Sequence, residues 1–304
     1  MKYLSICLML CLFAVDVDAA DAPKHGARIL FLTYSGTFKH GSVNRKDGAP
    51  LAPAEIAMTK LGVDSNLFRV DCTQDPHTAI TRENLANYDI VMFYTTGPRE
   101  KWDVSDDNLN YLCTEWVKQR GHGFIGAHSA ADTLGDYEPY WEMLGGTFNG
   151  HPWGANNPAV TVKVHDTQHP ISKPWGSEFT IQDEIYQFKN WQPEKVRVLM
   201  SLDFSKTRPI ADHHIPIAWV KQYGDGRVMH MSLGHREEVW ENPTYLASML
   251  GGVRWILGME PGDATPNPEL SSAQEAEAKA LFDAAPESER VKPKPPKLPA
   301  KKSK

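Results

Sequence analysis

Short, nearly continuous apolar runs recur through the first 130 residues, with amphipathic segments between them. Such runs are typical of strands buried on both faces of a parallel sheet, and the intervening segments have the periodicity of covering helices. The alternation predicts an α/β protein with a mainly parallel central sheet. The predicted strands are 28–34, 66–70, 85–94 and the start of 121–132, and the predicted helices are 53–61 and 106–119.

The second half of the chain has a different pattern, in which apolar and polar residues often alternate as in β-strands. From Gly262 the sequence becomes polar and rich in proline and alanine, and it ends in proline and lysine repeats. We therefore expect one domain over 27–260 and a C-terminal extension over 261–304, largely disordered apart from a short helix. The predicted strands are 159–164, 179–188, 196–202, 216–222 and 227–233, and the predicted helices are 242–257 and 272–284.

The stretch from Gly121 to Asp132 reads GHGFIGAHSAAD, an apolar strand that leads through small residues into a turn. Hydrolases place a serine or cysteine nucleophile at a strand-to-helix elbow of this kind. Here the projecting position holds His128, which can bind a metal or move a proton but is a poor acyl nucleophile. The alternative is that His128 is a buried strand-end residue satisfied by hydrogen bonds.

Four of the twelve histidines follow predicted strands or stand beside glycines, namely His40, His128, His151 and His235. Because ligands of parallel sheets bind at the carboxyl ends of the strands, we expect such residues to share one rim. Three or four imidazoles at one rim suit a divalent ion, most readily zinc, bound by His40, His128 and His235. The sequence has no H-E-x-x-H or C-x-x-C spacing, so such a site would draw its ligands from distant segments.

Asp183 and Glu184 are the best acid candidates, because they interrupt the apolar stretch FTIQDEIYQF. A carboxylate at the end of a buried strand has a dry environment, which would raise its pKa for acid–base work. We expect Glu184 to have this role, with Tyr186 orienting it. The alternative is that one of the two acids forms a salt bridge with an arginine on the rim.

Trp153 stands beside Gly154 and Asn156, and it is the tryptophan that we expect to be exposed. An exposed indole face could stack on the apolar face of a sugar ring. Nucleophilic serine catalysis is not favoured, because Ser35 and Ser129 lack the G-x-S-x-G surroundings.

The first 19 residues read as a secretory signal, with Lys2, an apolar run and small residues before Ala19. We therefore expect export to the periplasm or the extracellular space, and the rest of the chain has no second long apolar run that would predict a membrane span. The cysteines that remain, Cys72 and Cys113, are too few for a disulfide framework, and we expect two free, partly buried thiols, the alternative being that they pair in an oxidising compartment.

The net charge of −6 conceals a strong asymmetry. Removing residues 1–19, at −1, and residues 290–304, at +7, leaves a body at −12. A body this acidic does not favour nucleic acid or an anionic membrane as a partner. The basic tail could instead contact an acidic surface such as an envelope component.

Several motifs follow one another in order over residues 27–258, namely TFKH, YDIVMFY, GFIGAHSAAD, GGTFNGHP, QHPI, DEIYQF and GRVMHMSLGH. Together they resemble the ThuA-like proteins, which are named for trehalose utilisation. The resemblance implies the flavodoxin-like three-layer fold of the class I glutamine amidotransferase-like superfamily. It implies that the histidine and glutamate of an amidotransferase triad persist as His235 and Glu237, while His128 replaces the cysteine and removes glutaminase activity.

The resemblance also implies a sugar-related role, such as the processing of oxidised (keto) disaccharides. We expect hydrolysis or elimination on a carbohydrate or related small molecule, with the help of one divalent metal ion and without a nucleotide cofactor. The competing hypotheses are a non-catalytic carbohydrate-binding module and an interaction domain of an envelope complex, and the sequence leaves the oligomeric state open. The predicted catalytic residues are His128, Glu184 and His235, and the predicted substrate-binding residues are His40, His151, Trp153 and Tyr186.

Overall fold

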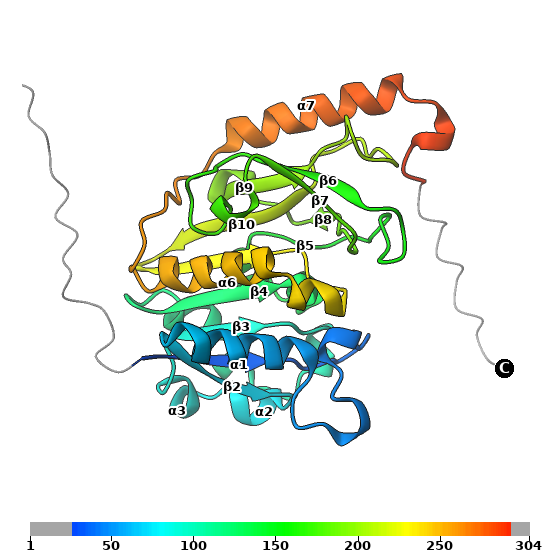
Figure 1. Cartoon of the computed structure of the whole chain (residues 1–304). Helices are drawn as coiled ribbons and strands as arrows, with labels where there is room; N and C mark the ends of the chain where they lie inside the picture. The colour runs from blue at the N-terminus through cyan, green and yellow to red at the C-terminus, as the bar shows by residue number, and fades with distance from the viewer. Residues whose placement is uncertain (1–25, 293–304) are drawn as a thin grey trace, which may run out of the picture.

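The structure is a computed structural model that describes residues 26–292, so the predicted signal peptide and residues 293–304 of the basic tail lie outside it. Its centre is one sheet of nine strands, and two further short strands form a separate ribbon (Figure 1). The strands are β1 (Ala27–Leu32), β2 (Phe68–Thr73), β3 (Ile90–Phe93), β4 (Gly123–Ala127), β5 (Thr147–Phe148), β6 (Val160–Val164), β7 (Glu178–Ile181), β8 (Phe188–Lys189), β9 (Arg197–Leu202), β10 (Pro216–Tyr223) and β11 (Gly226–Met231).

Half of the large sheet is parallel and follows the flavodoxin order. The strands run β2-β1-β3-β4-β11, with every neighbouring pair parallel, which is the 2-1-3-4-5 arrangement of doubly wound folds. β3 and β4 are buried at every residue, as their uninterrupted apolar sequences predict. The predicted α/β class with a mainly parallel core is confirmed.

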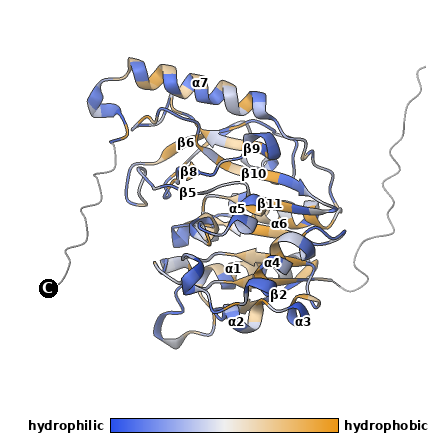
Figure 2. Ribbon diagram, turned by 180° about the vertical axis from the view of Figure 1, so that it is seen from behind, coloured by the Kyte–Doolittle hydropathy of each residue, from blue (hydrophilic) through white to orange (hydrophobic). Residues whose placement is uncertain are grey.

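Helices cover both faces of the parallel half and give the fold three layers. α1 and α6 pack in one hydrophobic cluster, and α2 to α5 pack in a second cluster on the other face. Figure 2 shows hydrophobic residues concentrated in the central strands. None of the helices within residues 26–292 combines the length and the hydropathy that a bilayer span requires. The helices are α1 (Pro53–Ser65), α2 (Pro76–Ala79), α3 (Arg82–Leu85), α4 (Asp106–Tyr111), α5 (Glu138–Leu144), α6 (Pro243–Ile256) and α7 (Pro268–Ala284).

The other half of the sheet is antiparallel, and here one predicted strand is wrong. β11 forms a hairpin with β10, and the sheet continues through β9, β6 and β7. The predicted strand 179–188 breaks after Ile181, because the next residues leave the sheet before β8 pairs with β5. A continuous strand would direct Asp183 and Glu184 to opposite faces, whereas the break brings both to the rim.

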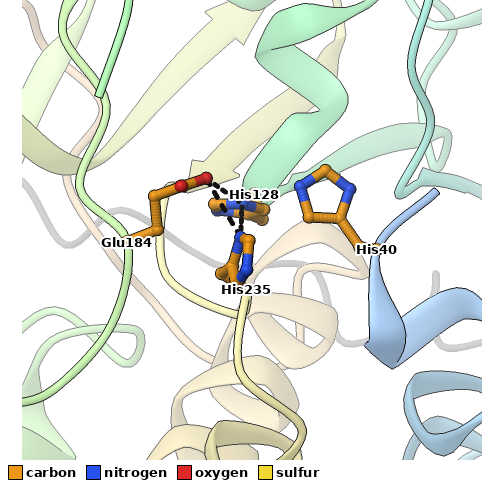
Figure 3. Close-up of side chains that lie close together, drawn as sticks. All are labelled: His40, His128, Glu184 and His235. Atoms are coloured by element: carbon orange, nitrogen blue, oxygen red, sulfur yellow. Dashed lines mark hydrogen bonds and ion pairs between the residues drawn. The ribbon is translucent and has the colours of Figure 1, made fainter. Parts of the chain in front are cut away.

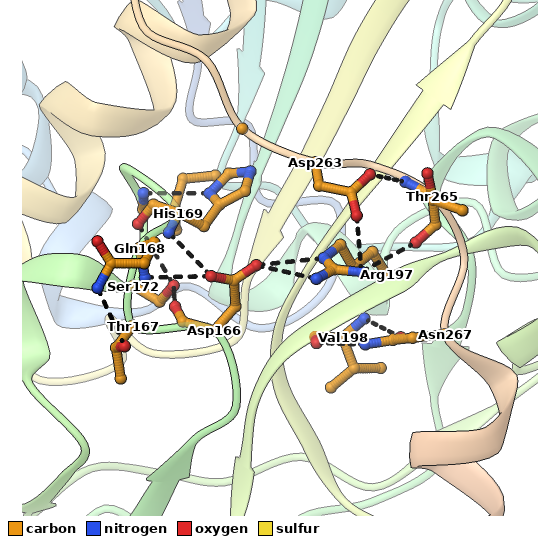
Figure 4. Close-up of polar contacts among 12 residues, drawn as sticks. Asp166, Thr167, Gln168, His169, Ser172, Arg197, Val198, Asp263, Thr265 and Asn267 are labelled. Atoms are coloured by element: carbon orange, nitrogen blue, oxygen red, sulfur yellow. Dashed lines mark hydrogen bonds and ion pairs between the residues drawn. The ribbon is translucent and has the colours of Figure 1, made fainter. Parts of the chain in front are cut away.

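The C-terminal extension is also more ordered than its composition predicts. α7 is a 17-residue helix that buries Ala278 against the core, and Glu277 pairs with Lys163 on β6 at 2.7 Å. Before the helix, Arg197 on β9 joins Asp166 to Asp263, and Asn267 bonds both backbone atoms of Val198 (Figure 4). Polar residues of this segment are thus held by specific partners, and residues 261–292 are ordered beyond the helix expected over 272–284.

The two remaining thiols agree with the sequence. Cys72 is half-buried, Cys113 is buried, and both are free. The predicted helix over 106–119 is also present, although it is divided into α4 and a π-helical turn, Leu112–Trp116.

His230, in the middle of β11, is a fully enclosed ionisable group of the core. It is fully buried, its ring lies 4.3 Å from that of Trp219, and neither ring nitrogen has a hydrogen-bond partner within the described part of the chain. Burial, with a smaller contribution from His128, lowers the pKa of His230 to about 3. The folded protein therefore resists a proton that the unfolded chain accepts below about pH 6.5.

This linkage predicts acid sensitivity that His230→Leu relieves. Above pH 6.5 His230 is neutral in the folded and in the unfolded protein and has no effect on stability through its charge. As the pH falls from 6.5 towards 3, the unfolded chain takes up a proton at His230 and the folded protein does not, so the free energy of unfolding decreases. Between pH 7 and pH 5 the parent should lose about 2 kcal/mol more unfolding free energy than His230→Leu, measured by urea denaturation. The control is His77→Leu at an exposed histidine, which should behave as the parent. Equal losses in the parent and His230→Leu would contradict the assignment.

Candidate functional site

Four residues from four distant segments meet at the carboxyl ends of the parallel strands (Figure 3). His128 and His235 follow β4 and β11, His40 lies in the loop after β1, and Glu184 lies in the segment after β7. One potential ligand atom from each lies within 4.8 Å of those of the other three. The predicted convergence of the histidines is confirmed, and we refer to these four residues as the cluster.

The backbone at His128 has the strained conformation of an elbow. His128 has φ of 41°, in the left-handed region, and it begins a five-residue 3-10 turn. Gly126 makes the bend possible, because a Cβ there would lie 2.7 Å from His230 Nδ1 and 2.9 Å from Leu144 Cδ1. The small residues of GHGFIGAHSAAD thus leave room for a turn that projects His128 over the end of the sheet.

A single hydrogen bond fixes the His128 tautomer. Its Nδ1 lies 2.8 Å from the carbonyl oxygen of Ser232, just after β11. Because a carbonyl oxygen only accepts, Nδ1 donates, and Nε2 of the neutral ring keeps a lone pair directed into the cluster. The ring of Tyr186 packs against His128 with centroids 4.4 Å apart. Tyr186 is buried and thus supports the position of His128 by contact.

Three cluster atoms already have the spacing of metal ligands. His235 Nδ1 lies 3.0 Å from Glu184 Oε2 and 3.3 Å from His128 Nε2, and His128 Nε2 lies 3.5 Å from Glu184 Oε2. Ligands about 2.1 Å from a tetrahedral ion are separated by roughly 3.4 Å. These three atoms can either share the proton of His235 or bind a divalent ion. Two imidazole nitrogens and one carboxylate oxygen are suitable ligands for such an ion.

His40 completes the cluster from the side. It is 3% exposed, and its ring lies 4.9 Å from each of the His128 and His235 rings. Burial, followed by the charges of His128 and His235, lowers the pKa of His40 to about 2, so the ring is neutral. Its Nδ1 has no hydrogen-bond partner among residues 26–292. A neutral, buried imidazole with a free nitrogen is suited to metal ligation.

The pKa of Glu184 is shifted opposite to the prediction. Burial by itself raises this pKa, but the interactions with His128 and His235 outweigh burial and lower it. Glu184 is therefore ionised at neutral pH. An ionised carboxylate that lies between imidazoles is better suited to bind a metal ion than to act as a general acid.

Asp183 holds the loop that carries His235. Its Oδ2 accepts from the Gly234 backbone N–H at 2.6 Å, and its Oδ1 accepts from the Arg236 backbone N–H at 3.0 Å. The alternative of a salt bridge between this acid pair and a rim arginine is wrong for Asp183, because it bonds the backbone N–H of Arg236, whose guanidinium pairs with Glu238. Asp183 is buried, and the two bonds on either side of His235 fix the direction of its ring.

Further hydrogen bonds hold the same loop from the opposite side. Tyr94 Oη and Trp240 Nε1 both donate to the Gly234 carbonyl, at 2.9 and 2.8 Å, and Ser42 Oγ donates to the His235 carbonyl at 2.8 Å. Because the loop already holds the His235 ring in place, little conformational entropy is lost when a ligand binds to it.

His151 lies at the outer edge of the cluster. Its Nδ1 is 3.1 Å from Glu184 Oε1, so Glu184 uses one oxygen for His151 and the other for His128 and His235. The side chain of His151 is 49% exposed, and its ring stacks on Phe148 with centroids 5.7 Å apart. Among the imidazoles in and beside the cluster, that of His151 is the most accessible to a molecule from solvent.

Two other predictions are corrected by the structure. Trp153 is 1% exposed, donates from Nε1 to the Pro209 carbonyl and packs on Phe204, so the expectation of an exposed stacking face is wrong. Glu237 pairs with Lys46 at 2.7 Å, and the carboxylate on His235 is that of Glu184.

Asp132 was not selected from the sequence, although it ends the elbow stretch. It lies on the 3-10 turn that His128 begins, and burial raises its pKa to about 6, against the charges of His128 and Lys189. The sequence feature that points to Asp132 is its position four residues after His128, at the end of the elbow stretch.

Comparison with known proteins supports the family resemblance. The trehalose utilisation (ThuA) family model matches residues 29–256, whereas a comparison with curated protein sequences finds no match. The fold is similar to that of a putative ThuA-like protein from Bacteroides uniformis, with a TM-score of 0.58 and 21% identity over 83% of this chain and 99% of that one. A putative ThuA-like protein from Parabacteroides merdae aligns with a TM-score of 0.56 and 13% identity over 80% of this chain and 98% of that one.

A glutamine amidotransferase from Thermotoga maritima overlaps more loosely, with a TM-score of 0.44 and 13% identity over 84% of this chain and 95% of that one. The family match covers most of the chain, and at these identities the ThuA-like structures show a shared fold. The chain belongs to the ThuA, or trehalose utilisation, family.

Proposed function

We propose that this protein is an enzyme that binds one divalent metal ion at the cluster and acts on a carbohydrate or an oxidised (keto) sugar. The observation that carries the proposal is the triangle of His128 Nε2, His235 Nδ1 and Glu184 Oε2, with edges of 3.0–3.5 Å. His40 adds a fourth, neutral donor.

The donor set favours zinc. Three imidazoles and one carboxylate are ligands that zinc accepts in tetrahedral geometry, and other transition metals accept the same atoms. The outer contacts follow the usual pattern of metal-ligating histidines, because His128 donates its other N–H to the Ser232 carbonyl.

The carbohydrate part of the proposal rests on the family, whose description is trehalose utilisation. A bound divalent ion would supply Lewis acidity for hydrolysis or elimination at a C–O bond. His151 is placed to move the proton, because Glu184 orients its Nδ1 while about half of its side chain is exposed. His128 occupies the elbow, so acyl-enzyme chemistry of the glutaminase type is not part of the proposal.

Export is also part of this proposal, and it is supported by the predicted signal in residues 1–19. The competing function is a non-catalytic sugar-binding module, which the absence of a serine or cysteine at the elbow would allow. Turnover separates the two. Metal-loaded protein that binds trehalose or its keto derivative without converting it would favour the module.

The first prediction of the proposed function concerns metal content. Purified mature protein should contain about one equivalent of a divalent ion by elemental analysis, and His128→Ala should contain less than roughly a tenth of that, because it removes one side of the triangle. His77→Ala, at an exposed histidine outside the cluster, is the matched control and should retain the ion. A parent that stays metal-free after dialysis against zinc, manganese and nickel would contradict the proposal.

The second prediction concerns Asp183, which positions His235. Asp183→Asn places an amide N–H against one backbone donor, so the loop should lose one bond and metal affinity should fall roughly 10- to 100-fold. Affinity is measured by competition with a chromogenic chelator.

The matched control is Asp203→Asn, since Asp203 is also buried and bonds the Ser205 backbone at 2.9 Å rather than the His235 loop. Equal losses of affinity in both variants would show that Asp183 acts only through general stability.

A further inference from the structure

Phe38 is a large apolar side chain left in solvent beside the cluster. It is 60% exposed, and the other exposed large hydrophobic residues within 26–292, Ile56, Val63 and Met259, are aliphatic residues on or just after helices α1 and α6. The Phe38 ring meets the ring of His40 edge-on, with centroids 4.8 Å apart. An aromatic face is therefore presented to solvent directly against one member of the cluster.

The loop is held so that Phe38 keeps this position. Thr96, just after β3, donates from Oγ1 to the Phe38 carbonyl at 2.9 Å and accepts from the Thr37 backbone N–H at 3.3 Å. The Gly36 N–H donates to the Thr96 carbonyl at 3.0 Å. Three bonds to one threonine hold the backbone of residues 36–38, the segment that carries the exposed ring.

The opposite side of the cluster is polar. His151 is half exposed and bonds Glu184, which lies across the cluster from the His40 side (Figure 3). A site with one aromatic wall and a few hydrogen-bonding groups suits a molecule with an apolar face and a polar edge. A pyranose ring has this division, because its C–H face packs on aromatic rings while its hydroxyls remain free for polar groups.

We infer that Phe38 forms a sugar-binding subsite beside the cluster, where its ring packs against the C–H face of a pyranose unit. The carbohydrate nature of the ligand rests on the proposed function. Phe38 takes the stacking role that the buried Trp153 is unable to perform. It binds substrate without holding the metal ion.

The test measures trehalose binding by calorimetry with the metal-loaded mature protein, in the parent and three variants. Phe38→Ala should weaken binding roughly tenfold, or about 1.4 kcal/mol, while Phe38→Tyr should stay within about twofold of the parent. Ile56→Ala, which removes another exposed hydrophobic side chain, should bind as the parent does. Metal content should be the same in all four proteins.

The outcomes separate this inference from the function on which it rests. A parent that binds trehalose and a Phe38→Ala variant that binds it equally well would overturn the subsite and leave the proposed function standing. Loss of the metal ion from Phe38→Ala would also overturn it, because Phe38 would then act on the cluster rather than on the sugar. A metal-loaded parent that binds neither trehalose nor its keto derivative would overturn the carbohydrate assignment and the subsite together.

Discussion

The hydrogen bond from His128 Nδ1 to the Ser232 carbonyl is the interaction on which the site depends. It joins the ends of β4 and β11, two neighbouring parallel strands, so the sheet itself fixes the tautomer of the elbow histidine. Once Nδ1 carries the proton, the lone pair of Nε2 is directed to Glu184 and His235. The positive φ of His128 and the missing side chain at Gly126 are the backbone conditions that allow this direction.

The adjacent acids Asp183 and Glu184 show how one short segment supplies two kinds of support. Asp183 accepts backbone N–H groups on both sides of His235 and fixes a neighbouring loop, while Glu184 faces the imidazoles and stays ionised. Both depend on the end of β7 at Ile181, since only a chain that leaves the sheet brings successive side chains to one site. The break in the strand is thus a requirement of the cluster.

The sequence predicted those parts of the protein that follow from local patterns. Apolar runs located the parallel strands, and the rule that ligands bind at the carboxyl strand ends placed His40, His128 and His235 together. The sequence did not predict the properties that depend on residues far away along the chain. The pKa of Glu184 falls because of two histidines some 50 residues away in either direction, and Trp153 is buried by residues such as Phe204. The helix predicted over 272–284 is present within α7, but its start at Pro268 and its attachment to the body were not predicted, because its anchors are single polar pairs such as Glu277 with Lys163.

Anomalous X-ray diffraction from crystals of the purified protein measures most directly whether the cluster holds one metal ion. We expect one strong peak, about 2.0–2.2 Å from His128 Nε2, His235 Nδ1 and Glu184 Oε2, at the absorption edge of the ion found. A map from zinc-soaked crystals with no peak among these three atoms, and a proton shared between His235 and Glu184 instead, would contradict it.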